Sequence, residues 1–570
     1  MEHSKTVNLT GVAASQTPPF TIPSRTPQKL AAFYTPMDVA QTITDWAIRN
    51  AKDRILDPSY GGCAFLCAAL AAFTRLRNPA PGRGIFGVDV DPNVVRHLAS
   101  LLHAGAERGQ FAQGNFLAVE PQGSFSGFDC ILGNPPYINY HDIEKQESVL
   151  AQQQMAAQGL SICARASYWA YFILHSLRFL KEGGRMGMLL PISFARTDYA
   201  TTVRHILSKS FKKVHVVFLG ERIFENTDEQ ALILLCEGKR RACETTDTRN
   251  IAVFNADNRE DLRKVLGNPH LLSSREKLLS PQDNLYKGLI SDKAVELYEV
   301  AERSALTVRL GDWADTRIGV VTGANNFFIA SASQIKERKL ARAQFTPIVR
   351  RPREMTGLWF TDEDAQNLEA QDKECLLLSL DQTDAMPETL SSYIESAPDK
   401  VRNAAKCRER SPWFCVRHRY APEAFIHCMS SDWPRIVSNY SEATCTNNIY
   451  RLSWSNDERT PDDWLRLSLG SLSTLFQFSS EWCGRSYGSG VLKLEPKEVQ
   501  QLCVPIGSNL PSNLADSVDQ LLRRGEKEQA RAEVDGAFLG HALAFTSLDI
   551  STFEKARDTL QLRRQGQKVK

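Results

Sequence analysis

The chain has 570 residues, of which 42% are hydrophobic and 24% are charged, and its formal net charge is only +2. These values are those of an ordinary globular protein, and the length allows two or three domains with a large core. They exclude a membrane-embedded protein, because no apolar run approaches the ~20 residues that a spanning helix needs, and the small charge does not by itself indicate a nucleic-acid partner.

Residues 1–28 are rich in Ser, Thr and Pro, and we expect them to form a loosely ordered tail. No basic segment followed by an apolar stretch occurs there, which argues against a secretory signal. The 13 cysteines are scattered and include no Cys-x-x-Cys pair, a pattern typical of reduced thiols rather than of disulfides or a zinc site. The sequence therefore predicts a cytoplasmic protein without a metal centre.

Residues 29–255 alternate apolar runs with amphipathic segments. The predicted strands are 54–57, 84–89, 128–132, 186–190, 213–218 and 230–235, and the predicted helices are 65–76, 93–106 and 168–180. This alternation predicts an α/β domain with a doubly wound parallel sheet. The last two strands are joined by a connection with no room for a helix, so we expect them to pair antiparallel.

Beyond about residue 305 the alternation gives way to short strands, turns and scattered basic residues, which predicts a second, mixed α/β domain. We divide the remaining chain into a connecting segment at 256–305, the second domain at 306–508 and a helical segment at 509–570. Residues 514–544 have helical spacing and high charge, which predicts one or two surface helices.

The most informative segment is Gly-Asn-Pro-Pro-Tyr-Ile-Asn-Tyr at residues 133–140, directly after a predicted strand. Pro135 and Pro136 lack backbone donors and fix φ, so the strand must end in a stiff, extended loop. A rigid loop at the carboxyl end of a strand is where open α/β sheets place their chemistry. The Asn134 amide, the Pro135 carbonyl and the Tyr137 ring are suited to holding a planar amino group by its hydrogens while stacking on its ring.

A second polar turn, residues 57–66, follows the first predicted strand and begins a helix. Its two glycines allow a tight turn and a close approach to a ligand, and the helix N-terminus offers free N–H groups. Asp89 ends the next strand, where a carboxylate can accept both hydrogens of a ribose diol. We expect Asp91 to cap the helix that begins near Asn93, and Thr35 to cap the first helix, with Pro36 in its first turn.

Together these segments resemble the motifs of S-adenosylmethionine-dependent N6-adenine DNA methyltransferases of restriction–modification systems, in their gamma order. Phe-Tyr-Thr-Pro at 33–36 comes first, the Asp-Pro loop at 57–66 follows, Asn-Pro-Pro-Tyr at 134–137 comes next, and a long C-terminal extension ends the chain. The resemblance covers residues 29–255. The chain departs from the family in having Gly-Gly-Cys in the first loop and Asn115 in place of the usual Asp.

The resemblance implies a Rossmann-like, doubly wound, seven-stranded methyltransferase sheet with an antiparallel last strand. It also implies S-adenosylmethionine as the cofactor and S-adenosylhomocysteine as the product. The residues that it assigns to the cofactor are Tyr34, Thr35, Pro36, Asp57, Pro58, Ser59, Gly61, Asp89, Val90, Asn115, Phe116 and Asn134. The residues that it assigns to catalysis and to the flipped adenine are Asn134, Pro135, Pro136, Tyr137 and Phe224.

The C-terminal half resembles the target-recognition domain of the same enzymes in two segments, 318–328 and 484–496. Basic residues cluster at 350–353, 406–410 and 417–419, where some phosphate contacts are expected, although such clusters are more often solvated faces. The resemblance implies double-stranded DNA as the partner, no membrane, action as a monomer, and a cognate restriction endonuclease encoded separately in a prokaryote.

Several alternatives stay open from the sequence. Methylation of adenine in RNA or of the N4 amine of cytosine would use the same chemistry, and a catalytically silent DNA-binding protein could keep the fold. Glutamine methyltransferases also carry Asn-Pro-Pro-Tyr, but the ~300 residues after the first domain argue against them. No Pro-Cys dipeptide is present, which argues against C5-cytosine methylation.

Overall fold

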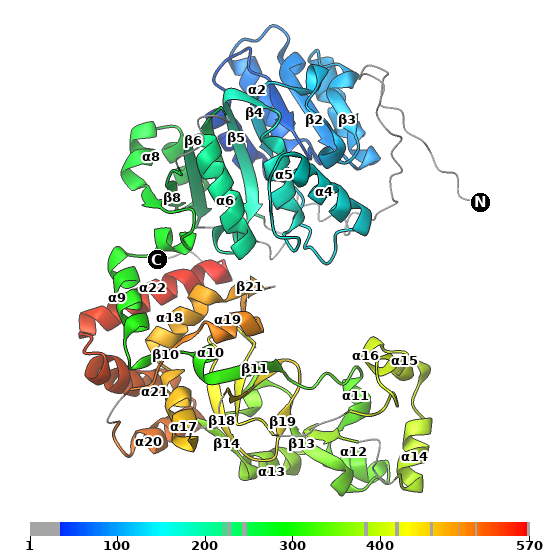
Figure 1. Ribbon diagram of the computed structural model, residues 1–570, viewed down its shortest axis with the longest axis vertical. Helices are drawn as coiled ribbons and strands as arrows, with labels where there is room; N and C mark the ends of the chain where they lie inside the picture. The colour runs from blue at the N-terminus through cyan, green and yellow to red at the C-terminus, as the bar shows by residue number, and fades with distance from the viewer. Residues whose placement is uncertain are drawn as a thin grey trace. The chain divides into compact units, whose positions relative to one another are not determined.

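The computed structural model describes residues 35–220, 223–224, 230–241, 248–380, 386–416, 421–455, 460–487, 490–507 and 510–566 (Figure 1). Its contacts divide the chain into two compact units. Unit 1 comprises Met1–Ile290 with Gly566–Lys570, and unit 2 comprises Ser291–Gln565. Within the described residues, no helix has both the length and the apolar character needed to cross a membrane.

Unit 1 contains a nine-stranded sheet in the order β3-β2-β1-β4-β5-β7-β6-β8-β9. Its strands are β1 Ile55–Asp57, β2 Ile85–Asp89, β3 Phe111–Gln113, β4 Phe128–Gly133, β5 Leu180–Pro191, β6 Phe211–Leu219, β7 Ala231–Lys239, β8 Ile251–Ala256 and β9 Lys277–Leu279. The five strands β3, β2, β1, β4 and β5 are parallel to one another. Strand β7 lies between β5 and β6 and is antiparallel to both. The doubly wound sheet with its antiparallel strand is confirmed, and β8 and β9 extend it beyond the expected seven strands.

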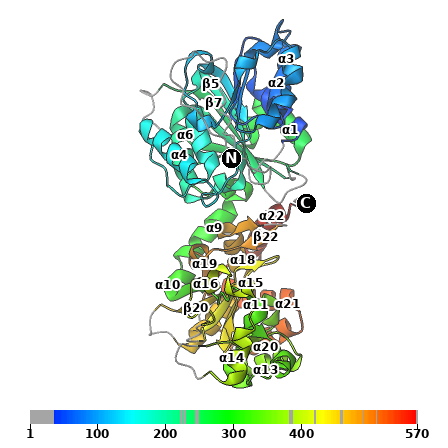
Figure 2. The ribbon, with the colours of Figure 1, turned by 90° about the vertical axis from the view of Figure 1, so that its right-hand side faces the viewer.

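Helices cover both faces of this sheet, and Figure 2 shows α1 and α2 on one side with α4 and α6 on the other. The helices are α1 Met37–Ala47, α2 Ala64–Arg75, α3 Ala99–His103, α4 Lys145–Ala157, α5 Tyr168–Ser176, α6 Asp198–Ser210, α7 Arg259–Leu266 and α8 Pro269–Arg275. The helix expected over 93–106 is instead a 3-10 segment, Pro92–Leu98, followed by the short α3. Asn93 and Val94 both have low α-helix propensity, which is consistent with this difference.

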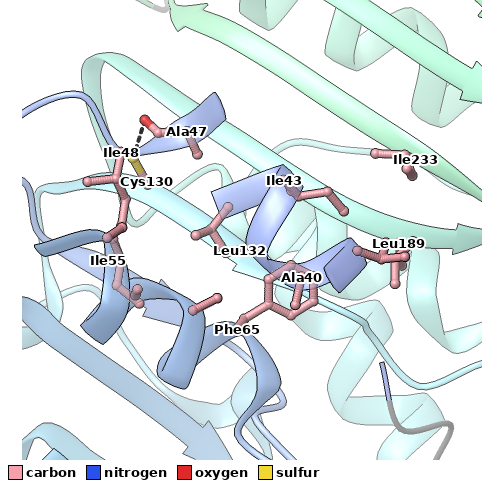
Figure 3. Close-up of a cluster of buried hydrophobic side chains, with 14 of the residues drawn as sticks. Ala40, Ile43, Ala47, Ile48, Ile55, Phe65, Cys130, Leu132, Leu189 and Ile233 are labelled. Atoms are coloured by element: carbon pink, nitrogen blue, oxygen red, sulfur yellow. Dashed lines mark hydrogen bonds between the residues drawn. The ribbon is translucent and has the colours of Figure 1, made fainter. Parts of the chain in front are cut away.

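The core beneath α1 fixes that helix on the centre of the sheet (Figure 3). Ala40 and Ile43 of α1 are fully buried in one cluster with Leu132 of β4 and Leu189 of β5. A Cβ on Gly187 of β5 would lie 2.6 Å from the Cγ2 atom of Ile43, so the glycine allows this close approach. The segment that precedes α1 is thereby held near the strands of the sheet that carry the predicted motifs.

Unit 2 is mixed α/β, as expected. It contains a five-stranded sheet (β11-β20-β16-β18-β14), a four-stranded sheet (β12-β15-β13-β19), a three-stranded sheet (β17-β22-β21) and the pair β10-β23. Its strands are β10 Thr307–Arg309, β11 Ala314–Ile318, β12 Ile329–Ala330, β13 Phe345–Val349, β14 Trp359–Thr361, β15 Leu376–Leu378, β16 Ala424–His427, β17 Met429–Ser430, β18 Ile436–Tyr440, β19 Thr444–Cys445, β20 Ile449–Trp454, β21 Arg485–Tyr487, β22 Val491–Lys493 and β23 Cys503–Pro505.

The helices of unit 2 include a long C-terminal helix that packs on a buried one. They are α9 Asp292–Arg303, α10 Leu310–Trp313, α11 Asn325–Phe328, α12 Ala332–Glu337, α13 Asp362–Ala370, α14 Glu388–Glu395, α15 Asp399–Arg402, α16 Ala405–Arg408, α17 Pro461–Gly470, α18 Thr474–Cys483, α19 Pro496–Gln500, α20 Leu514–Arg523, α21 Lys527–Val534, a π-helix Asp535–Ala542 and α22 Ser547–Gln565. Helix α22 contacts α18, and the buried Arg564 side chain forms an ion pair with Glu481.

The unit boundaries differ from the expected domains in two places. The expected connecting segment 256–305 is divided, because β9 pairs with β8 in unit 1 while α9 belongs to unit 2. The segment 509–565 lies in the same unit as 306–508. The expected surface helices are α20 and α21, which expose Asp516 and Lys527 and bury Val518 and Val534 in a shared apolar cluster.

Candidate active site

The loop after β4 lies directly against the loop after β1. A Cβ on Gly133 would lie 2.9 Å from Oδ1 of Asp57 and 3.1 Å from Cδ of Pro58, so only glycine permits this approach. The Ser59 hydroxyl donates a hydrogen bond to the main-chain oxygen of Asn134 at 3.0 Å. The two motifs are 75 residues apart in the chain, and the parallel pairing of β1 with β4 brings them together.

The side chain of Asn134 also contacts the segment before α1. Its Nδ2 donates to Oγ1 of Thr35 at 3.3 Å. The expected capping role of Thr35 is wrong, because α1 begins at Met37 with Pro36 in the N-cap position and no side-chain cap. Tyr34, which we assigned to the cofactor, lies outside the described residues. Pro135 is buried and Pro136 is half-buried.

The two aromatic rings expected around a target base lie in contact with each other. The ring centroids of Tyr137 and Phe224 are 6.5 Å apart, and their planes meet at 68°. Phe224 is 4% exposed and belongs to the same apolar cluster as Ile43 and Leu189. An edge-to-face pair leaves no room for a planar base between the rings. Stacking of a base between them therefore requires that the rings separate.

Asp57 is a buried carboxyl group at the centre of the site. Its Oδ1 accepts a hydrogen bond from the Ser59 amide at 3.0 Å. Burial raises the pKa of Asp57 to about 8, the Ser59 amide opposes this rise, and the charge of Asp89 adds to it. Burial therefore favours the protonated form of this carboxyl group at neutral pH.

The carboxylate of Asp89 organises the glycine turn. Its Oδ2 accepts from the Gly61 amide at 2.7 Å, and its Oδ1 accepts from the Asp91 amide at 2.9 Å. Gly61 has φ +41°, a left-handed conformation that favours glycine. Burial raises the pKa of Asp89. Asp91 caps the following 3-10 segment through the Asn93 amide at 2.9 Å, as expected, and Val90 between them is half-buried.

Asn115 and Phe116 are placed differently from each other. Oδ1 of Asn115 accepts from the Leu117 amide at 3.0 Å, and its Nδ2 donates to Oη of Tyr168 at 2.7 Å. Phe116 is 1% exposed and packs against Phe172, Phe179 and His175. The 3-10 turn Phe116–Ala118 places this ring in an aromatic core with α5, and its expected stacking on a cofactor ring stays a prediction.

Sequence reasoning missed two residues that connect the motifs. Tyr168 bonds to Asn115 through its hydroxyl, and its amide donates to the Ile138 oxygen at 2.9 Å, one residue beyond Tyr137. Arg259 pairs with Asp38 at 3.2 Å and donates to the oxygen of Ile223. Neither residue belongs to a motif, and only the position of Tyr168 at the start of a strongly apolar helix could have drawn attention to it.

The expected DNA-contacting segments of unit 2 are partly described. In the segment 318–328, Phe328 is buried, and Arg410 donates to the oxygen of Thr322 at 2.7 Å. The segment 484–496 contains the β21–β22 hairpin, but Gly488 and Ser489 lie outside the described residues, as does the basic cluster 417–419. The arginines of the basic cluster 350–353 line a cleft of about 640 Å³ together with Lys373 and Arg523, and with the acidic residues Glu354, Asp364, Asp372 and Glu374.

Among the described residues, no group of three or more His, Cys, Asp and Glu side chains could hold a metal ion. The polar groups at the carboxyl ends of β1, β2 and β4 are instead carboxylates, amides and main-chain groups. Such a set can bind a polar organic ligand and an amino group on a planar ring.

Comparisons with known proteins agree with this arrangement. Residues 24–277 match the N-6 DNA methylase family, and residues 282–539 match the C-terminal domain of the type II methyltransferase M.Eco57I. The chain is 21% identical to the type II methyltransferase M.AccI of Acinetobacter calcoaceticus, over 83% of this chain and 85% of that protein. It is 23% identical to M.XamI of Xanthomonas campestris pv. amaranthicola, over 85% and 86%.

A solved structure shows the same fold over most of the chain. The type IIL restriction–modification enzyme MmeI, determined in complex with DNA, superimposes with a TM-score of 0.55 at 12% identity, covering 92% of this chain and 75% of that one. The matched family covers the unit in which Asn134 lies beside the Asp57 loop, and the second match covers most of unit 2. Residues 24–277 therefore resemble the N-6 DNA methylase family, and these matches together show a site-specific adenine DNA methyltransferase of restriction–modification systems.

Proposed function

We propose that the chain uses S-adenosylmethionine as its methyl donor and binds it at the carboxyl ends of β1 and β2. The loop Asp57–Gly61 and the carboxylate of Asp89 would hold the cofactor, with the side chain of Asn115 at the next strand end. The hydrogen-bonding groups at this turn support the proposed fit. The left-handed Gly61 turn brings the Gly61 amide next to the half-buried carboxylate of Asp89 without a side chain in the way. When bound, S-adenosylmethionine supplies an activated methyl group.

Asn134 and Pro135 would prepare the amino group of adenine for methylation. The nitrogen lone pair of that group is delocalised into the ring, which makes the nitrogen a poor nucleophile. Oδ1 of Asn134 and the main-chain oxygen of Pro135 would accept its two hydrogens and draw the nitrogen toward tetrahedral geometry. This is catalysis by positioning and electrostatics. The observation that carries the proposal is the hydrogen bond from Ser59 to Asn134, which fixes the amine-binding loop against the cofactor loop.

A base within a duplex cannot reach such a loop, so we propose that the target adenine leaves the helix. Tyr137 and Phe224 would then form its two aromatic walls. Because these rings are in contact in this structure, binding of the base would include a movement of one ring away from the other. Pro136 would keep the loop extended while the base enters.

We further propose that the chain is the modification enzyme of a type II system, acts as a monomer on double-stranded DNA in the cytoplasm of a prokaryote, and is paired with a separately encoded endonuclease. The relatives M.AccI and M.XamI are type II methyltransferases matched along most of their length, which supports this role.

The proposal is tested by methyl transfer with purified full-length chain. Labelled S-adenosylmethionine is incubated with duplex DNA, single-stranded RNA or no nucleic acid, and the digested nucleosides are separated. We expect the label in N6-methyladenine from duplex DNA. Label in N4-methylcytosine or RNA would contradict the proposed substrate, and cofactor binding without transfer would indicate a silent DNA-binding protein. Methylome sequencing of cells that express the chain gives the recognition site.

The matched inactive control is Asn134→Ala. We expect this variant to bind S-adenosylmethionine normally and to lose at least ~10²-fold in kcat, because it lacks one of the two acceptors for the amine. A variant with a near-normal rate would remove Asn134 from the catalytic site.

A further inference from the structure

Arg259, the first residue of α7, joins two segments that are far apart in the chain. Its Nη1 lies 3.2 Å from Oδ2 of Asp38, which is 221 residues earlier. Its Nη2 donates to the main-chain oxygen of Ile223 at 3.1 Å. The Arg259 side chain is 24% exposed and that of Asp38 is 38% exposed, so this ion pair alone adds little stability.

Both contacted segments lead into the proposed active site. Asp38 lies in the first turn of α1, three residues after Thr35, whose hydroxyl bonds to Asn134. Ile223 immediately precedes Phe224, the ring that contacts Tyr137. One guanidinium group therefore fixes the position of α1 relative to the backbone that carries the aromatic wall.

The connection between β6 and β7 is not held by the sheet at this point. Strand β6 ends at Leu219 and β7 begins at Ala231, so the described residues Ile223 and Phe224 lie outside both strands. The Ile223 side chain is 3% exposed in the core. The Arg259 contact is a polar restraint on the backbone next to the Phe224 ring, and it comes from another element.

We propose that Arg259 is a positioning residue for the flipped adenine: by holding the Ile223 carbonyl it keeps the backbone that carries Phe224 beside Tyr137 while the ring turns aside to admit the base. This inference rests on the proposed function. A planar guanidinium can bond to a carboxylate and a carbonyl at the same time, whereas a lysine ammonium acts as a single point charge. Arg259→Lys should therefore keep the pair with Asp38 but lose the restraint on Phe224.

A purely structural role is the competing explanation, because α7 packs against α1. The chain offers a matched control in Arg275. This residue bonds to Asp261 at 2.7 Å and donates to the Asn255 oxygen at 2.8 Å, so it also bridges a carboxylate and a main-chain carbonyl. Asp261 and Asn255 do not belong to the proposed site. Arg275→Lys should therefore leave the reaction unchanged.

The test uses the full chain and a duplex with 2-aminopurine at the position of the methylated adenine. We expect wild type and Arg275→Lys to raise its fluorescence on binding. Arg259→Lys and Arg259→Gln should show less than half of that rise and at least about a tenfold lower kcat. Both variants should keep the wild-type Kd for S-adenosylmethionine, and the Lys variant should also keep the wild-type Tm. Full fluorescence and kcat in both Arg259 variants would overturn the inference.

If Arg259→Gln does not fold, Asp38→Asn provides the second measurement, because it weakens the anchor of the guanidinium without removing it. A fluorescence rise and kcat below those of wild type, by a smaller factor than in Arg259→Lys, support the inference. Values equal to wild type overturn it. A wild-type chain that neither methylates DNA nor raises the fluorescence would contradict the proposed function instead.

Discussion

At the scale of single residues, Asp89 fixes two main-chain segments of the proposed cofactor site. Its carboxylate holds both the Gly61 amide and the Asp91 amide. Asp89→Ala removes these contacts as well as the proposed acceptor for a ribose diol. Loss of hydrogen bonds to a charged group is worth about 1.5–3 kcal/mol, so we expect the Kd for S-adenosylmethionine to rise about 10- to 100-fold.

Isothermal titration calorimetry measures this change directly. Asp91→Asn is the control, because the Asp91 side chain caps the 3-10 segment Pro92–Leu98 and asparagine can keep this cap. An unchanged Kd in Asp89→Ala would exclude Asp89 from the cofactor site.

Asp57 gives the site a dependence on pH. Its pKa is raised from 3.8 to about 8 in the folded chain. The folded state therefore binds the proton more tightly than the unfolded state. The stability from this proton is fully present below pH ~4 and is lost as the pH rises to about 8, with a slope of up to about 1.4 kcal/mol per pH unit.

Asn at position 57 is neutral at every pH and lacks this slope. We expect the Tm of wild type, measured relative to Asp57→Asn by differential scanning fluorimetry, to fall between pH 4 and 8 and to level off above. A difference that stays constant over this range would mean that Asp57 is ionised in the folded chain.

At the scale of the elements, α22 is held to unit 2 by a buried charge pair. The side chains of Arg564 and Glu481 are 5% and 2% exposed, and the guanidinium contacts the carboxylate at 2.7, 2.9 and 3.2 Å. Arg564→Met removes the guanidinium that pairs with this buried carboxylate, which costs about 3–5 kcal/mol. We expect the denaturation midpoint of this variant in urea to fall.

The double variant Arg564→Met with Glu481→Met is the control. An apolar pair of similar volume should restore most of the loss. If the double variant unfolds at the same urea concentration as the single one, lost packing rather than the lost ion pair causes the destabilisation.

The elements also show what the sequence could predict. The apolar runs that became β1, β2, β4 and β5 are recognisable locally, because buried parallel strands are continuously hydrophobic. The antiparallel pairing of β6 and β7 followed from the short connection alone. Strand β9 was missed, because it has only three residues and is defined by its pairing with β8.

The site residues that directly follow a recognisable strand could be predicted from the sequence, and those placed by long-range packing could not. Asn134 and Asp57 follow strands, so the sheet had to place them at the same edge. The burial of Phe116 depends on Phe172 and Phe179, more than 50 residues away, and a motif match carries no information about such packing. The bond of Arg259 to a main-chain oxygen has no residue signature, because every residue has a carbonyl.

At the scale of the whole molecule, the net charge of +2 means that DNA binding must come from local groups of basic residues. Phosphate contacts release counterions, so affinity should fall steeply with salt. We expect the Kd for duplex DNA, measured by fluorescence anisotropy, to rise at least about tenfold between about 50 and 200 mM salt. An affinity that does not depend on salt would exclude an interface built on phosphate contacts.

The position of β7 has a consequence for synthesis of the chain. Strand β6 is made before β7, yet in the finished sheet β7 separates it from β5. While the nascent chain emerges, β5 and β6 each present an open, apolar edge with unpaired amides and carbonyls, which is a template for association with other chains. Translation that stops before Ala231 leaves both edges open, so we expect such fragments to aggregate. The late strand closes the gap between them.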